Sequence, residues 1–266
     1  PVLYTFYSRV LYMPGDAVCR SLEAPQSAVR KLHPAHEVVF ILRQLIEKAV
    51  DRRAPRVYVM DGDIMKACDF VSHKAFAEAA RGRGIDEVLV LAWLRKWRTM
   101  RSAFCLDTET TSEDIERTRS LPKGDPAAPL LFNILLDTLA VRFVKMARKK
   151  SGESCCKTAR GIDLVLFADN YWLVATDHTM PGSMTVAWLS LLGDYGWETP
   201  MQELTWCTTA EDDGSPVINI EKKKTKRTTA QEGFKVLGNF LTFDSIFEAE
   251  LEHRLMRAHR VSWANW

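Results

Sequence analysis

The sequence predicts an α+β domain in which helices pack against a small antiparallel β-sheet. Several segments carry apolar residues at helical spacing, and the longest of them covers residues 126–150. Two other segments, 56–64 and 161–177, are apolar runs of the kind that form strands. Hydrophobic residues make up 47% and charged residues 26% of the 266-residue chain, which is typical of a globular protein with its own core.

Length and charge set the outer limits. At about 150 residues per domain, the chain is long enough for one large domain or two fused subdomains. The 36 Lys and Arg residues against 34 Asp and Glu residues leave a net charge of +2, which excludes a polycation and an acidic tail protein. Nucleic-acid binding stays open, because basic residues gather in three stretches, 81–101, 142–160 and 221–235.

Cysteine usage and the start of the chain give further expectations. The six cysteines contain no C-x-x-C pair, which argues against a zinc site and against a disulfide framework. We therefore expect reduced thiols and an intracellular protein. No run of about 18 apolar residues occurs, so we expect no membrane span. The start, Pro-Val-Leu-Tyr, has neither a Met nor a leader and indicates a piece cut from a longer chain.

The first half of the chain predicts helices around one strand. The expected elements are, in order, a helix (36–50), a strand (56–64), two helices (72–82 and 85–101) and a loose hairpin (102–122). Gly82 and Gly84 separate the two helices. Asp61 and Asp63 continue the face of the strand's valines, because alternate residues of a strand point the same way.

The second half predicts hairpins between helices. The expected elements are a helix (126–150), a hairpin (161–177), a helix (183–195), short strands (204–208 and 216–220), a hairpin (234–243) and a last basic helix (246–260). Asp125 suits the N-cap of the first helix and Pro126 its first position. Asp169-Asn170 suits the turn of the first hairpin, because Asn tolerates the positive φ that a tight turn needs.

The positions of Asp63 and Asp169 are the most informative feature. Each follows a strongly apolar strand, where a carboxylate is costly unless it is paired or bound to metal. If the two strands are neighbours, both carboxylates converge on one site. Carboxylates of this kind bind the two divalent ions with which polymerases and nucleases activate oxygen nucleophiles. The alternative is that both are ordinary turn aspartates.

The residues around these two aspartates resemble the motifs of reverse transcriptases of the non-LTR retrotransposon and group II intron type. The matching segments occur in family order: Gln26 with Arg30, then D-I-M-K-A-C-D-F-V-S-H (63–73), L-P-K-G-D-P-A-A-P-L-L-F-N-I-L-L-D (121–137), F-A-D-N (167–170) and F-K-V-L-G (234–238). They correspond to the fingers element, motifs A, B and C, and the primer grip. One such motif is weak, but five in order are specific.

The resemblance implies a right-hand polymerase with fingers and palm and with most of the thumb absent. Residues 1–55 would be partial fingers, 56–250 the palm with a fingers insertion at about 72–122, and 251–266 the start of the thumb. The implied activity is RNA-directed DNA synthesis on an RNA template, from a DNA primer, with deoxynucleoside triphosphates. The missing domains would belong to a longer polyprotein, and the protein would work in the nucleus and cytoplasm.

The resemblance also assigns roles to individual residues. Asp63, Asp169 and Asn170 would be catalytic, and Asp63, Asp169 and the Ile64 carbonyl would hold two Mg²⁺ ions, or Mn²⁺ in their place. The remaining roles are nucleotide binding by Arg30, Lys66, Cys68, Lys123 and Gly124, primer grip by Leu237 and Gly238, and backbone binding by Lys222, Lys223, Lys224, Lys226 and Arg227. Ordinary interpretations remain for these positions: a helix-entry turn, a tight hairpin, a solvated Arg and a solvated lysine loop.

Several positions depart from the family pattern. Asn170 replaces the second motif C Asp, and Cys68 replaces the bulky residue that blocks a sugar 2′-hydroxyl. The other departures are Lys123 for Gln, Ala128 for Ser, and Gln202 with Glu203 where a motif D Lys is expected, a role that Lys224 would fill in a looser alignment. Two alternatives therefore stand beside the polymerase. One is a degenerate domain that only binds nucleic acid, and the other is an RNA-dependent RNA polymerase.

Overall fold

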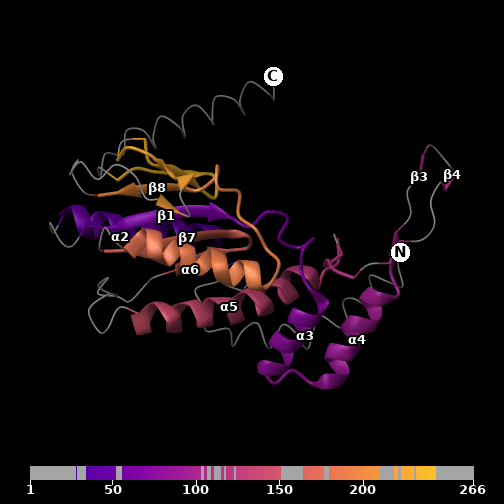
Figure 1. Cartoon of the computed structure of the whole chain (residues 1–266). Helices are drawn as coiled ribbons and strands as arrows, with labels where there is room; N and C mark the ends of the chain where they lie inside the picture. The colour runs from indigo at the N-terminus through magenta and orange to yellow at the C-terminus, as the bar shows by residue number, and fades with distance from the viewer. Residues whose placement is uncertain are drawn as a thin grey trace.

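The computed structural model is shown in Figure 1. It describes residues 28, 34–51, 56–102, 105–106, 109–110, 115–116, 118–122, 124–150, 164–176, 180–209, 219–220, 223–230 and 232–243.

Helices and strands occur in a mixed order, as the α+β prediction requires. The helices are α2 (Ala35–Asp51), α3 (His73–Gly82), α4 (Glu87–Arg98), α5 (Ala128–Lys150) and α6 (Met180–Asp194). The main strands are β1 (Tyr58–Asp63), β6 (Leu164–Phe167), β7 (Asn170–Ala175), β8 (Thr205–Thr208) and β11 (Lys226–Arg227). Short ladders are formed by β2 (Arg101–Ser102), β3 (Cys105–Leu106), β4 (Glu109–Thr110), β5 (Ile115–Glu116), β9 (Asn219–Ile220), β10 (Lys223–Lys224), β12 (Phe234–Val236) and β13 (Asn239–Leu241).

The five-stranded sheet has the order β11-β8-β1-β7-β6, with β1 in the centre. Strands β8, β1, β7 and β6 pair antiparallel, whereas β11 runs parallel to β8. The sheet is therefore mixed rather than purely antiparallel, which corrects that detail of the predicted fold class. The α+β class itself is confirmed.

The two faces of the sheet pack against different helices, because alternate residues of each strand point to opposite sides. Tyr58 and Met60 of β1 belong to the large core that α3, α5 and α6 share. Val57 and Val59 belong to a second, smaller core with α2 and the β12–β13 hairpin. Figure 1 shows α5 and α6 lying along one side of the sheet.

Helix α5 is the central support of the large core. It is 23 residues long, and its buried side chains face several directions: Leu130, Leu131, Ile134, Leu135, Leu139 and Phe143. A helix that is apolar on most sides must be covered by other elements on most sides. Here α3 contacts it on one side and α6 on another, so α5 joins the sheet to the α3–α4 pair.

Side-chain caps begin helices α3 and α4, and a buried ion pair joins α4 to the residues before α5. The Ser72 Oγ accepts from the Ala75 N–H at 3.3 Å, and Asp86 caps α4 by accepting from the Val88 N–H at 2.7 Å. A buried ion pair joins Lys96 of α4 to Asp125, with Nζ and Oδ2 2.6 Å apart. The ion pair therefore fastens α4 to the residues just before α5.

Some predicted boundaries differ from the structure. The helix predicted from Pro126 begins at Ala128, because the Asp125 Oδ1 accepts from the Ala127 N–H at 3.0 Å and closes a turn there. The hairpin predicted over 102–122 is present as the pairs β2–β5 and β3–β4. The helix predicted over 246–260 and the proposed thumb lie outside the described residues. None of the helices in the described ranges is long and apolar enough to cross a bilayer.

Candidate active site

Asp63 and Asp169 meet at one end of the central strands. Asp63 is the last residue of β1 and lies opposite Asn170, the first residue of β7. Asp169 occupies the turn before β7, and its carbonyl oxygen accepts from the Ile64 N–H at 3.0 Å. The predicted convergence of the two aspartates is therefore present, and their strands are direct neighbours.

The turn that carries Asp169 differs from the prediction by one residue. Phe167 pairs with Asn170, so the two turn residues are Ala168 and Asp169. The positive φ that was expected at Asn170 occurs at Ala168, where φ is 53°. A residue with a Cβ pays about 1–2 kcal/mol for this conformation. Strain of this kind clusters at functional sites, and here it presents Asp169 at the tip of the hairpin.

Burial and like charge act together on the carboxylates. Burial, then the charges of Asp169 and Glu203, raise the pKa of Asp63 to about 6, against a small opposing effect of the Ile64 N–H. Burial, with the charge of Asp63, likewise raises the pKa of Asp61 to about 7, although the Trp172 and Thr205 side chains lower it. The ionised form of both carboxyl groups is therefore destabilised, and a bound divalent cation would offset this effect.

The donor set suits Mg²⁺ in chemistry and in number. Mg²⁺ in polymerases is usually held by one or two carboxylates, with water and substrate phosphates completing the octahedron. Among the described residues, no three His, Cys, Asp or Glu side chains gather in a way that encloses a metal ion. Asp63 and Asp169 are thus an open carboxylate pair, and the substrate would contribute the remaining ligands.

Asn170 follows Asp169 in the chain and lies opposite Asp63 in the sheet. Its Nδ2 donates to the Asp169 Oδ1 at 3.3 Å, and its Cα partner on β1 is Asp63. An Asp at this position would add a third negative charge to a site that already repels itself. The amide instead donates a hydrogen bond, which orients Asp169 at the expense of one charge for metal binding.

The loop after Asp63 is fixed by residues that follow α6. The Trp197 indole donates its Nε1–H to the Ala67 carbonyl at 2.8 Å, and the Met65 N–H donates to the Glu198 carbonyl at 2.9 Å. Lys66 is exposed with a φ of 48° and Cys68 is half-buried. Both predicted nucleotide-binding side chains thus belong to the loop that begins at the carboxylates.

The predicted motif B residues are described in part. Gly124 is exposed and has a φ of 81°, a conformation that favours glycine. A Cβ at this position would meet no atom of the described residues within 4 Å, so the surface there is open. Lys123 and Arg30 lie outside the described residues. Ala28, in the same predicted fingers element as Arg30, accepts a 2.6 Å hydrogen bond from Asn133 of α5.

The predicted primer grip is a tight hairpin. Leu237 and Gly238 form the two-residue loop between β12 and β13, with φ values of 48° and 83°. Two positive φ values in succession are typical of a type I′ turn, in which a leucine is strained. Val236 and Leu241 pack into the α2 side of the sheet, which is the side that Asp63 faces.

The basic run is split among different environments. Lys226 is exposed on the edge strand β11. The Arg227 guanidinium carbon lies 5.1 Å from the centre of the Trp206 ring, so this side chain covers the tryptophan. The backbones of Lys223 and Lys224 form β10, whereas Lys222 lies outside the described residues. Lys226 is thus the member with a described, exposed side chain.

Sequence reasoning missed the part played by Gly62. A Cβ on Gly62 would collide with the ring end of Tyr171 and lie 2.9 Å from Leu204 Cδ2. Because Gly62 has no side chain, the Tyr171 ring packs close to the backbone of β1. The Tyr171 hydroxyl donates a hydrogen bond to the Thr199 Oγ1 at 3.2 Å. The glycine between two aspartates, in D-G-D, was the available signal for such a close approach.

A helix-backed sheet that holds two carboxylates where its strands end is the palm of a right-hand polymerase, and this is the class that the fold and the site define. Comparisons with known proteins agree. The family described as reverse transcriptase (RNA-dependent DNA polymerase) matches residues 8–240. The chain therefore belongs to the reverse transcriptase family, as its motifs predicted.

The chain is similar in sequence to a retrotransposon protein and in fold to solved telomerase structures. The Retrovirus-related Pol polyprotein from the type-1 retrotransposable element R2 of Popillia japonica is 32% identical over 127 residues, which are 47% of this chain and 20% of that protein. Telomerase from Candida albicans, in complex with a TWJ fragment of telomeric RNA, has a TM-score of 0.61 at 12% identity, over 90% of this chain and 36% of its own. Apo telomerase from Candida tropicalis, truncated from its C-terminal domain, has a TM-score of 0.56 at 14% identity, over 79% and 42%. At these identities the telomerase likeness concerns the fold alone.

Proposed function

We propose that this chain is the polymerase part of an RNA-directed DNA polymerase, which extends a primer 3′-hydroxyl with deoxynucleotides. The observation that carries the proposal is the pairing of Asp63 with Asn170 across β1 and β7, which brings the Asp169 turn beside Asp63. Asp63 ends the central strand β1, and Asp169 lies in the two-residue turn between β6 and β7. Ladder pairs on both sides of that turn hold the two carboxylates in register, and phosphoryl chemistry needs such a fixed geometry.

Asp63 and Asp169, with the Ile64 carbonyl, would hold two Mg²⁺ ions, for which Mn²⁺ can substitute. The ions would supply activation of the primer hydroxyl and neutralisation of the leaving pyrophosphate. The raised pKa of Asp63 supports this role, because a carboxylate that is buried beside other negative charges gains most from a bound cation. The hydrogen bond from Asn170 would keep Asp169 directed at the same ions.

The surrounding residues would bind the nucleotide and the primer. Lys66 would approach the triphosphate from the exposed loop after Asp63, and Cys68 would lie beneath the sugar. Gly124 would approach the base pair through its open surface. Leu237 and Gly238 would press on the primer end, and Arg30 and Lys123 would contact the triphosphate, in line with the family pattern.

The substrates we propose are an RNA template, a DNA primer and deoxynucleoside triphosphates. The chain spans about a fifth of the R2 relative, which is a polyprotein. We therefore propose that it works as one part of a longer protein, inside the cell. Lys226, the exposed basic residue of β11, would follow the nucleic-acid backbone.

A primer-extension assay tests this function. A labelled DNA primer annealed to an RNA template is incubated with the chain, Mg²⁺ and either deoxynucleotides or ribonucleotides. We expect extension with deoxynucleotides on the RNA template. A product made only from ribonucleotides would favour the RNA polymerase alternative, which the small side chain of Cys68 supports.

A second candidate is a domain that binds nucleic acid without chemistry, and Asn170 is the observation that favours it. Under this alternative, the chain binds primer and template but adds no nucleotide. The Asn170→Asp variant separates the two, because it restores the family charge. Synthesis in the variant alone would identify a damaged polymerase rather than a protein with a binding role only.

A further inference from the structure

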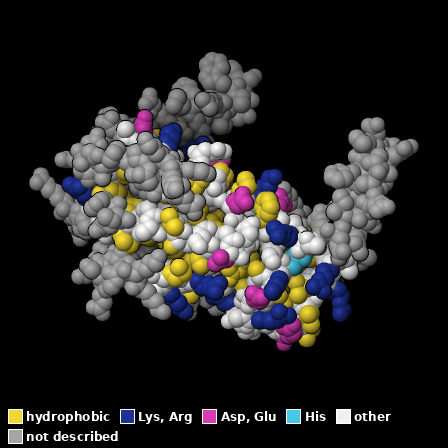
Figure 2. Space-filling model, in the orientation of Figure 1, with side chains coloured by type: hydrophobic (Ala, Val, Ile, Leu, Met, Phe, Trp, Pro, Cys, Tyr) yellow, Lys and Arg dark blue, Asp and Glu magenta, His cyan; other side chains and the backbone are white. Residues whose placement is uncertain are grey.

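Helices α3 and α4 line a hollow that shares no residue with the carboxylate site. Its volume is about 710 Å³, and both helices line it. Figure 2 shows dark-blue Lys and Arg side chains gathered over this end of the molecule, with fewer acidic ones among them. A hollow of this size accommodates a ligand as large as a nucleotide.

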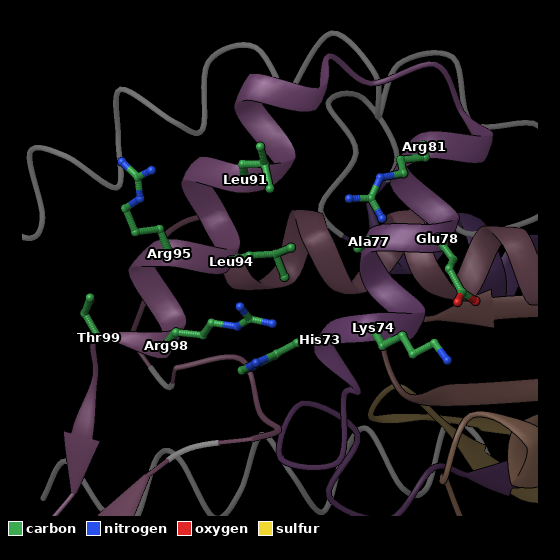
Figure 3. A pocket seen from close by; sticks show the side chains of 10 residues that line it. All are labelled: His73, Lys74, Ala77, Glu78, Arg81, Leu91, Leu94, Arg95, Arg98 and Thr99. Atoms are coloured by element: carbon green, nitrogen blue, oxygen red, sulfur yellow. The ribbon is translucent and has the colours of Figure 1, made fainter.

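The side chains that point into the hollow are cationic or apolar. In Figure 3, the guanidinium groups of Arg81 on α3 and Arg98 on α4 point toward the opposite helix, with Leu94 between them. The acidic residue of the lining, Glu78, points away. Arg95, one turn before Arg98, also lines the hollow, but its guanidinium group points outward, away from Arg81 and Arg98. The interior therefore presents two guanidinium groups to whatever enters.

These guanidinium groups are available to a ligand. Arg98 has no ion-pair partner among the described residues, and it is exposed. Arg81 binds the exposed Glu87 through two contacts of 2.6 and 2.7 Å, which use two of its five N–H donors and leave the others for a ligand. His73, at the edge of the hollow, already donates from its Nε2 to the Ser120 carbonyl at 3.0 Å.

The two helices hold the arginines in fixed positions. Phe76 of α3 packs edge-on against Trp93 and Trp97 of α4, with ring centres 5.7 and 5.0 Å apart. The buried pair of Lys96 and Asp125 fastens α4 to the start of α5. A ligand therefore finds the opposing guanidinium groups already arranged, which lowers the entropy cost of binding.

We propose that the α3–α4 hollow binds a phosphate group of a nucleic-acid strand outside the catalytic site. Planar guanidinium groups match phosphate oxygens in geometry and charge. Leu91 and Leu94 supply apolar walls on which a sugar or base can lie. The proposal rests on the proposed function in one respect: the nucleic acid is the one on which the polymerase works.

Salt-dependent binding of a labelled single-stranded RNA tests the proposal. Fluorescence anisotropy is measured at a series of salt concentrations for the parent chain, Arg98→Gln and Arg95→Gln. Losing one phosphate contact lowers the slope of log affinity against log salt by about 0.7 for a single strand. We expect this loss in Arg98→Gln and an unchanged slope in Arg95→Gln, which removes the same charge from the same helix.

The outcomes separate this proposal from the proposed function. Equal slopes in Arg98→Gln and Arg95→Gln would overturn the site, because general attraction depends on charge alone. A thermal shift with inorganic phosphate that Arg98→Gln abolishes, without a change in RNA binding, would overturn the assignment to nucleic acid. Primer extension is measured separately, so a chain without synthesis can still show the Arg98 effect.

Discussion

Breaking the buried pair of Lys96 and Asp125 should destabilise the fold and disturb the start of α5. Their side chains are 4% and 1% exposed, and Nζ lies 2.6 Å from Oδ2. Asp125 directly follows Gly124 and also closes the turn to Ala127. Lys96→Met keeps most of the aliphatic side chain but leaves the Asp125 carboxylate buried without this cation.

The expected cost follows from burial. Removing one partner of a buried ion pair costs about 3–5 kcal/mol, because the other charge stays in a poorly solvated site. At about 2–4 °C per kcal/mol for a large domain, the midpoint of thermal unfolding falls by about 6–20 °C. The double variant Lys96→Met/Asp125→Asn removes both charges and keeps an acceptor for the Ala127 N–H. It should be more stable than either single variant.

The test is circular dichroism during heating, together with urea unfolding, of the parent chain, Lys96→Met, Asp125→Asn and the double variant. Arg81→Gln is the control, since its pair with Glu87 is exposed. A melting midpoint for Lys96→Met within about 2 °C of the parent chain would refute the reasoning. A double variant as unstable as the sum of both single variants would also refute it.

Three further predictions concern the site. Gly62→Ala should lose about 1–3 kcal/mol of unfolding free energy, measured in urea, because its Cβ collides with Tyr171; unchanged stability would contradict this packing. Cys68→Phe should raise the preference for deoxy- over ribonucleotides by about 10- to 200-fold in single-nucleotide incorporation. A preference unchanged from that of the parent chain would show that this side chain does not face the sugar. Mg²⁺ at about ten times its Kd should raise the melting midpoint by about 3–6 °C at pH 8. Because the pKa of Asp63 is raised from 3.8 to about 6, its ionised form costs stability progressively as the pH rises between these values, and at pH 5 this carboxyl is mostly protonated in the folded chain. The rise should therefore largely disappear at pH 5 and in Asp63→Asn.

Local patterns predicted that Asp63 and Asp169 lie at the ends of apolar strands, whereas their convergence depends on the pairing of β1 with β7, which the sequence left as a condition. The alternation of residues along β1 assigns Asp63 to one face of the strand. The two apolar runs on either side of Asp169 predict a hairpin from the local sequence. The turn residues could not be predicted, because Asn170 is the better turn former by propensity. Strand register is set instead by burial, with Leu164, Leu166, Tyr171 and Leu173 on one face. Ala168 takes the strained position as a consequence.

Features that depend on how distant segments pack together could not be predicted from the sequence. The distance between Arg81 and Arg98 follows from how α3 packs on α4, through Phe76 and the two tryptophans. The start of α5 was shifted by the side chain of Asp125, whose partner on α4 no local pattern identifies. The parallel pairing of β11 with β8 likewise joins segments that are separated in the chain.

The most direct test of the account is nucleotide addition by three matched variants. Asp63→Asn, Asp169→Asn and Asp194→Asn each remove one negative charge with little change in shape, and Asp194 is exposed at the end of α6. Single-nucleotide incorporation is measured on an RNA template with Mg²⁺. We predict losses of about 100- to 1000-fold for Asp63→Asn and Asp169→Asn, with Asp194→Asn equal to the parent chain. Incorporation at the parent rate by Asp63→Asn or Asp169→Asn would contradict the account.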